Sequence, residues 1–196
     1  MAQEHRTGIM AGMEIDKHAV STKLLWVDLE MTGLDVNEHV ITEIAAEVTG
    51  WDFKTIATYE AVIFHPDDVL DKANEFSKQM DAQNGMFNEI RTKGRPEQDV
   101  VREFAEFIRT NFAGEPAVLA GNSIHNDRKF IAKWWPEVND LLHYRMMDVS
   151  SWKLVMEGKY GVQFEKQETH RAAVDIRESI AELQFYLDWL QDAGRG

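Results

Sequence analysis

The sequence contains no cysteine, which excludes disulfide bonds, zinc–thiolate sites and cysteine nucleophiles. Long apolar runs are also missing, and no stretch approaches the roughly 20 residues that a membrane-spanning helix needs. The segment 1–22 lacks the apolar core of a secretory signal, and Glu4, Glu14 and Asp16 make it too acidic for a typical organelle transit peptide. We therefore expect a flexible tail over 1–22, no membrane partner and a cytoplasmic location; a mitochondrial location would fit this N-terminus poorly.

Positive charge is scarce as well. The chain has 21 Lys and Arg against 34 Asp and Glu, a formal net charge of −13. Proteins that grip long nucleic acids present basic surfaces, because neutralising phosphates dominates that affinity. A nucleic-acid substrate would therefore touch this chain locally, through few phosphates, with metal ions supplying much of the positive charge. The simpler alternative is that the acidity keeps the protein soluble.

The rest of the composition is that of one globular domain, with 44% apolar and 28% charged residues in 196. Apolar and β-branched runs predict strands over 23–31, 41–49, 55–64, 117–120 and 143–149. Helical spacing and Gly/Pro boundaries predict helices over 96–113, 124–135, 151–157 and 171–191, with short helices and loops over 65–95. Ser150 is expected to cap the helix over 151–157. This order predicts an α/β fold for residues 23–193, a mixed five-stranded sheet flanked by helices.

Two acids interrupt the first predicted strand, which reads KLLWVDLEM. Asp28 and Glu30 are two residues apart, so they project from the same face as Leu24 and Trp26. Paired carboxylates in a buried strand repel each other and lose hydration, which costs several kcal/mol unless a cation such as Mg²⁺ or Mn²⁺ compensates. The alternative, commoner for an isolated D-x-E, is that both acids are solvated or that one pairs with an arginine.

Further acids and a histidine stand at helix starts. Asp127 precedes Phe130 by three residues and so begins an apolar stripe, although a first-turn acid also interacts favourably with the helix dipole. Asp175 lies at the edge of the stripe of the last predicted helix. His170 can share its site only from the loop before that helix, because five helical residues span about 140° of rotation. An unperturbed histidine suits proton transfer near neutrality, but a surface or capping role is the more common one.

Together these residues can support one chemistry. Two divalent ions held by carboxylates about 4 Å apart can activate water and stabilise a leaving oxygen in phosphodiester hydrolysis. The protein then supplies only acids for the ions and a base for the water. An acidic protein could cut RNA in this way.

Four segments resemble the DEDDh exonucleases, the ribonuclease H-like group named for four acids and a histidine, and within it the oligoribonuclease branch. In the order of the family they read WVDLEMTGL at 26–34, AGNSIHNDRKF at 120–130, HYRMMDVSS at 143–151 and HRAAVDIRESIAELQFY at 170–186. DLEMTGL with HYR and H-x4-DIRES is a highly specific combination. The resemblance implies a ribonuclease H-like fold and a 3′→5′ exoribonuclease that cuts very short RNA, from dinucleotides to a few nucleotides, into 5′-mononucleotides.

The resemblance also implies roles for particular residues. It implies that two Mg²⁺ or Mn²⁺ ions are held by Asp28, Glu30, Asp127 and Asp175. His170 would be the general base, and Leu34 would wedge between the two bases of a dinucleotide. A pocket that caps the 5′ phosphate, and so excludes longer RNA, would comprise Ser123, Arg145, Ser150 and Ser151. The family is homodimeric, and Tyr144 would reach this pocket from the partner subunit; otherwise Tyr144 is an ordinary strand aromatic and Arg145 a surface charge.

One stretch departs from the family pattern. Phe76 and Asp81 stand where the family usually has a Trp and, five residues later, a His. Phe76 can still stack on a base, whereas Asp81 beside a phosphate would be repulsive, so either that contact is lost or the alignment slips here.

Two alternative functions remain: an exonuclease that trims longer RNA or DNA, and a nucleotide-binding protein without catalysis. The acidic surface and the HYR segment argue against the first, and the complete acid set against the second.

Overall fold

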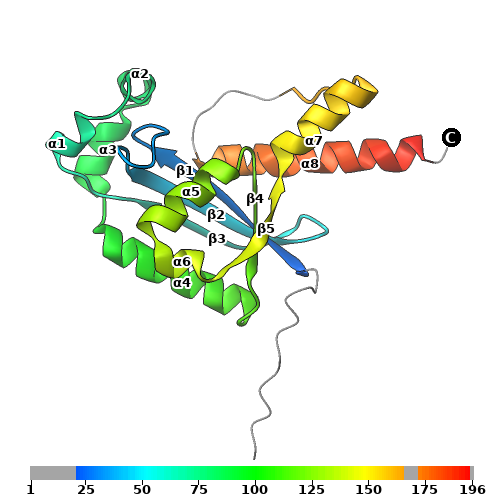
Figure 1. The fold of residues 1–196 in the computed structure, drawn as a ribbon, viewed down its shortest axis with the longest axis horizontal. Helices are drawn as coiled ribbons and strands as arrows, with labels where there is room; N and C mark the ends of the chain where they lie inside the picture. Colours follow the sequence, from blue (N-terminus) through cyan, green and yellow to red (C-terminus); the bar gives the residue numbers. More distant parts are fainter. Residues whose placement is uncertain (1–20, 166–171, 195–196) are drawn as a thin grey trace, which may run out of the picture.

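The protein is described by a computed structural model covering residues 21–165 and 172–194. A mixed sheet in the order β3-β2-β1-β4-β5 forms its middle layer (Figure 1). β1 pairs antiparallel with β2 and parallel with β4, β2 pairs antiparallel with β3, and β4 pairs parallel with β5. The strands are β1 Lys23–Met31, β2 Ile41–Gly50, β3 Thr55–Val62, β4 Ala117–Gly121 and β5 Leu142–Asp148. The predicted mixed five-stranded sheet is confirmed.

The helices agree with the sequence prediction in order and number of long elements. They are α1 Asp67–Leu70, α2 Glu75–Asn84, α3 Met86–Lys93, α4 Glu97–Phe112, α5 His125–Trp134, α6 Pro136–Asn139, α7 Val149–Val155, the π-helical turn Met156–Tyr160 and α8 Ala172–Ala193. The start of α7 was predicted wrongly. Ser150 does not cap α7; the side chain of Asp148 does, accepting a hydrogen bond from Ser150 N at 3.0 Å, so the helix begins at Val149.

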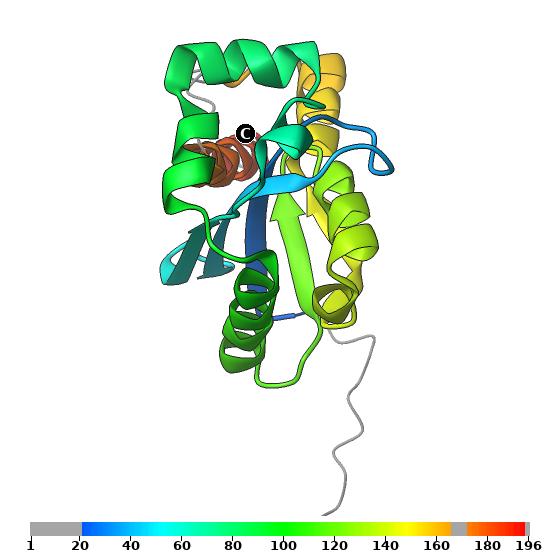
Figure 2. The same ribbon diagram turned by 90° about the vertical axis from the view of Figure 1, so that its left-hand side faces the viewer.

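The alternation of side chains along β1 divides the core between two helical layers. Leu25, Val27 and Leu29 pack with α4, α5 and α6 on one face. Leu24 and Trp26 pack with α7 and α8 on the other face, and Figure 2 looks along α8, which is seen end-on. Each side chain that is fully buried in this way contributes roughly 1.5–3 kcal/mol. β1 is therefore clamped from both faces, and groups at its C-terminal end are held in fixed positions.

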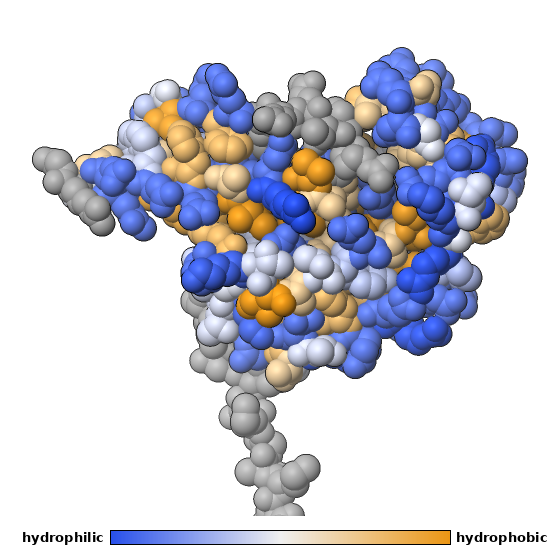
Figure 3. All heavy atoms as spheres, turned by 180° about the vertical axis from the view of Figure 1, so that it is seen from behind, coloured by the Kyte–Doolittle hydropathy of each residue, from blue (hydrophilic) through white to orange (hydrophobic). Residues whose placement is uncertain are grey.

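A third apolar cluster lies beyond the sheet, where α1 and α3 pack around Leu70, Phe87 and Ile90. This unit stands beside the C-terminal end of β1, in the region predicted as short helices (Figure 1). Hydrophilic residues dominate the face shown in Figure 3, while apolar side chains gather toward the end formed by α7 and α8. No helix among the described residues is long and apolar enough to cross a bilayer.

Candidate active site

Three acids from two elements meet at the C-terminal end of β1. Ligand oxygens of Asp28 and Glu30 on β1 and of Asp175 on α8 all lie within 4.8 Å of one another. We call this group the carboxylate cluster. Ile176 and Ile180 dock α8 against Trp26, and this packing carries Asp175 to the strand. The structure thus brings together three of the four acids that the sequence singled out.

The fourth acid, Asp127, lies beside the cluster but not within it. Asp127 is buried at the start of α5, in the opposite helical layer, and its Oδ1 accepts a hydrogen bond from Leu29 N at 3.0 Å. Close approach of β4 to β1 helps to place it, since a Cβ on Gly121 would lie 2.9 Å from the backbone oxygen of Val27. The carboxyl group of Asp127 is therefore fixed against the backbone between the two β1 acids.

Burial and mutual repulsion disfavour negative charge at this site. Burial raises the pKa of Asp28 well above its usual value, and the charges of Asp127, Glu30 and Asp175 raise it further. Burial also raises the pKa of Asp127 to about 7, although the Leu29 N–H opposes this shift. A divalent cation would relieve both effects, and hard oxygen ligands suit Mg²⁺ or Mn²⁺. The donor set therefore fits such an ion.

An apolar cavity of about 200 Å³ adjoins the cluster, and Glu30 forms part of its wall. The predicted base-binding residues Leu34 and Phe76 both line it and are strongly exposed, at 68% and 61%. The remaining wall consists of Met31, Gly33, Asn74, Ser77, Met80 and Met86. We call this space the base cavity, because it offers flat and flexible apolar surfaces next to acids that could hold a metal.

The loop that carries Leu34 is tied down by contacts that the sequence did not reveal. The Nδ1 atom of the His39 ring accepts a hydrogen bond from Asp35 N over 3.1 Å. The backbone N–H of His39 donates to Asp35 O over 2.8 Å. The imidazole also fills the space over Gly33, where a Cβ would lie 2.5 Å from His39 Nε2. Leu34 is therefore presented from a closed loop despite its exposure.

Asp81 has a structural use in this chain. Its Oδ1 accepts a hydrogen bond from Phe87 N at 2.6 Å, which caps the start of α3, and its carbonyl accepts from Gly85 N at 2.7 Å. The structure therefore places Asp81 as a helix cap, while Phe76, five residues earlier on α2, lines the base cavity.

The residues assigned to a 5′-phosphate cap fall into two groups. Ser123 and Ser150, which we call the serine pair, have their hydroxyl oxygens 3.1 Å apart, and Ser123 N donates to Ser150 Oγ over 2.9 Å. Arg145 lines a separate cavity of about 160 Å³ together with His143 and Met146. Tyr144 is 63% exposed on β5, with the Arg145 guanidinium 5.1 Å from its ring centre, and Ser151 is exposed on α7.

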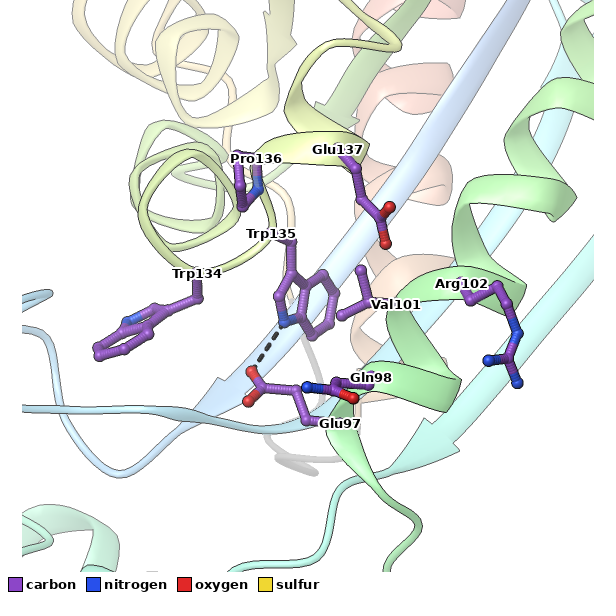
Figure 4. Close-up of a pocket in the computed structure, with 8 residues that line it drawn as sticks. All are labelled: Glu97, Gln98, Val101, Arg102, Trp134, Trp135, Pro136 and Glu137. Carbon is purple, nitrogen blue, oxygen red and sulfur yellow. Dashed lines mark hydrogen bonds between the residues drawn. The ribbon is translucent and has the colours of Figure 1, made fainter.

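A larger cavity of about 570 Å³ contains none of the predicted site residues. It lies between α4, α5 and α6, where Trp135 Nε1 donates to Glu97 Oε1 over 2.9 Å (Figure 4). The size of a cavity therefore does not identify the candidate site in this fold, whereas the carboxylate cluster does. His170, the predicted base, lies outside the described residues.

Comparison with known proteins agrees with this geometry. The Exonuclease (RNase_T) family model matches residues 25–183. The chain is 43% identical over 167 residues to an oligoribonuclease of Francisella tularensis subsp. tularensis (strain FSC 198), covering 83% of this chain and 93% of that protein. It is 36% identical over 173 residues to the mitochondrial oligoribonuclease of Bos taurus, covering 86% and 73%. This chain belongs to the exonuclease family, in its oligoribonuclease branch.

Solved structures of exonuclease I have a fold similar to that of this chain. E. coli exonuclease I in complex with a dT13 oligonucleotide superposes with a TM-score of 0.63 at 15% identity, covering 88% of this chain and 43% of that one. A product-bound exonuclease I gives a TM-score of 0.61 at 14% identity, covering 88% and 46%. These likenesses support the predicted ribonuclease H-like fold. The protein is a nuclease, and its family and acidic cluster imply the use of divalent metal.

Proposed function

We propose that this exonuclease is a 3′→5′ exoribonuclease that degrades very short RNA, from dinucleotides to a few nucleotides, to 5′-mononucleotides. The observation that carries the proposal is the position of the base cavity, which shares Glu30 with the carboxylate cluster. A base held in the cavity leaves its phosphodiester beside the acids. The names of the oligoribonuclease relatives support RNA of this length as substrate.

In this proposal Asp28, Glu30, Asp127 and Asp175 hold two Mg²⁺ or Mn²⁺ ions. When bound, such ions supply an activated water and stabilise the leaving oxygen in phosphodiester hydrolysis. The chain contributes the carboxylates, held in place by β1, α5 and α8. His170 is proposed as the general base that takes the proton of the attacking water.

Substrate orientation is assigned to apolar side chains at the other end of the site. Leu34 and Phe76 are proposed to hold the bases by stacking, which is tolerant of sequence because every base has a π-face. Neither side chain carries charge, so the affinity for bases does not depend on phosphate neutralisation. This suits a chain with a net charge of −13.

The limit on substrate length is assigned to the pocket that holds the 5′ end of the RNA. Ser123, Ser150, Ser151 and Arg145 are proposed to cap the 5′ phosphate, completed by Tyr144 of the partner subunit in a homodimer. The proximity of the two hydroxyls of the serine pair supports a polar pocket, and the exposure of Tyr144 leaves it accessible to a second copy. A closed pocket at the 5′ end has no exit for further nucleotides.

A comparison of substrates tests the proposal. Turnover of a 5′-phosphorylated diadenylate and of a 20-nucleotide RNA is measured with Mg²⁺, with Mn²⁺ and with excess EDTA. We expect rapid hydrolysis of the dinucleotide with either ion, at least about tenfold slower hydrolysis of the 20-mer, and no activity in EDTA. Equal degradation of the two RNAs would exclude the short-substrate assignment, and undiminished activity in EDTA would exclude metal dependence.

A further inference from the structure

Asn122 joins the serine pair to the helix that carries Asp175. Its amide nitrogen donates to Ser179 Oγ over 2.7 Å and to Glu182 Oε2 over 3.2 Å, and its amide oxygen accepts from Ser150 Oγ over 3.2 Å. Ser179 and Glu182 belong to α8 and are buried, Glu182 completely. We call Asn122, Ser150, Ser179 and Glu182 the polar chain. A fully buried acid in such a network needs hydrogen-bond partners at both oxygens.

The partners of the α8 residues leave one orientation for the Asn122 amide. Ser179 donates its hydroxyl hydrogen to Asp175 O over 2.8 Å, so its oxygen can only accept from Asn122. Glu182 accepts at both oxygens, and the hydroxyl of Tyr186 donates to the second over 2.9 Å. Since both groups facing Asn122 from α8 are acceptors, the amide nitrogen must point to them. The amide oxygen then points away from α8.

This orientation determines the direction of the hydrogen bonds in the serine pair. Ser150 must donate its one hydroxyl hydrogen to the amide oxygen of Asn122. Its oxygen is left to accept, and it receives the backbone N–H of Ser123. The hydrogen between the two hydroxyls therefore belongs to Ser123. Of the pair, Ser123 holds the hydroxyl hydrogen that can turn toward a ligand.

We propose that Asn122, oriented by Glu182, is a positioning residue that makes Ser123 the hydroxyl donor to the 5′ phosphate. The inference rests on the proposed function, in which the serine pair caps that phosphate. Phosphate oxygens only accept, so they need a hydroxyl with a free hydrogen. The polar chain also ends on the backbone of Asp175, so it sets the separation between the cap and the carboxylate cluster, and hence the length of substrate that spans them.

The test compares KM for two dinucleotides, a diadenylate with a 5′ phosphate and one with a 5′ hydroxyl. We define the KM ratio as KM for the 5′-hydroxyl dinucleotide divided by KM for the 5′-phosphorylated one. The wild-type ratio tests the cap itself. A ratio near one would mean that no cap binds the 5′ phosphate and that the polar chain has no ligand to act on. Given discrimination in the wild type, we expect Asn122→Ala to reduce it about fivefold or more, through a higher KM for the 5′-phosphorylated substrate. Asn88→Ala, an exposed substitution on α3, should keep the wild-type ratio.

A double-mutant cycle separates positioning from general damage. If Asn122 acts through the serine pair, adding Asn122→Ala to Ser150→Ala lowers the KM ratio no further, because both changes remove one link. Independent, multiplying losses would overturn the proposal, as would a folded Asn122→Ala variant with the wild-type ratio. Circular dichroism establishes folding for each variant.

Glu182→Gln provides the test should Asn122→Ala not fold. The glutamine amide offers a donor as well as an acceptor, so Ser179 is the one group on α8 that still requires the Asn122 amide nitrogen. We expect a loss of about twofold in the KM ratio, since the orientation of the Asn122 amide is then favoured less strongly. Asp188→Asn, which removes an exposed acid from the same helix, is the matched control. A Glu182→Gln variant with the same ratio as this control would contradict the proposal.

Discussion

At the scale of single residues, the candidate site consists of buried carboxylates that destabilise the protein when no cation is bound. Asp28 is the clearest case, because burial and four neighbouring acids all raise its pKa. Such a residue is retained at a cost to stability, which is typical of functional sites. The cost should therefore be measurable when the residue is replaced.

We expect Asp28→Asn to lower turnover of short RNA by at least about 10³-fold, because a charged group proposed as a metal ligand is lost. The same variant should melt at a higher temperature than the wild type in EDTA, because a buried repelling charge is removed. Steady-state kinetics and thermal denaturation provide the two readouts. Asp188→Asn serves as control, and wild-type turnover in Asp28→Asn would refute the role of the cluster.

Asp127 gives a pH dependence of stability whose sign follows from its raised pKa. The folded pKa is about 7, above an unfolded value of about 3.9, so between these values the native state binds more protons. Without metal, the contribution of Asp127 to stability is greatest below pH 4 and falls as pH rises to 7, by at most about 4 kcal/mol. Urea denaturation in EDTA at pH 5 and pH 8 should show this fall in the wild type.

The Asp127→Asn variant is the reference for that measurement. Asparagine keeps an acceptor for Leu29 N but does not titrate in this range. The loss of stability between pH 5 and pH 8 should therefore be smaller in the variant than in the wild type. Equal losses would show that Asp127 titrates normally.

At the scale of elements, α3 depends on a cap from the preceding helix. We expect Asp81→Ala to destabilise the protein by about 1 kcal/mol, because Phe87 N loses its partner. In a chain of this size that corresponds to a fall of about 2–4 °C in melting temperature. Since Met86 in α3 lines the base cavity, KM for dinucleotides should also rise.

Asparagine is the matched replacement at this position. It caps helices about as well as aspartate, so Asp81→Asn should stay close to the wild type in melting temperature and KM. If Asp81→Asn were as destabilised as Asp81→Ala, the negative charge and not the hydrogen bond would be responsible.

The elements themselves were largely predictable, because their signals are local. Period-two and 3.6-residue patterns located the five strands and the long helices, and both faces of β1 were assigned correctly. The α7 cap was missed, since Asp148 and Ser150 are equally good capping types and only geometry chooses between them. The order of the motifs predicted that the four acids share one site. It did not predict that Asp127 and Asp175 come from opposite helical layers.

Contacts between residues far apart in the sequence were not predicted, because they leave no local pattern. The link from Asn122 to Glu182 spans 60 residues and has no local pattern. His39 gave no signal in the sequence, because its partners are the backbone and the bare face of Gly33. Met80 could have been found, since it lies one helical turn after Phe76 and shares its face.

At the scale of the whole molecule, the proposed homodimer can be tested by mixing two inactive chains. Asp28→Asn removes a proposed metal ligand within one protomer, and Tyr144→Ala removes a contact proposed to act in the other. A mixed dimer then keeps one complete site, so equal co-expression should restore about a quarter of wild-type activity. Light scattering should give about twice the monomer mass of 22.6 kDa.

The two parent variants assayed separately are the controls for this mixture. Their activities should add to far less than that of the co-expressed sample. A mixture no more active than the sum of its parents would mean that Tyr144 acts within its own protomer or not at all.

The arrival of acids from two opposite layers has a consequence for synthesis of the chain. Asp28 and Glu30 emerge early from the ribosome, Asp127 later, and Asp175 only with the last helix. Because a domain folds as a unit, a nascent chain that lacks α8 holds only part of the proposed ligand set. Capture of ions at the proposed site would then coincide with docking of α8. A ribosome-bound fragment without α8 would therefore leave nearby RNA intact.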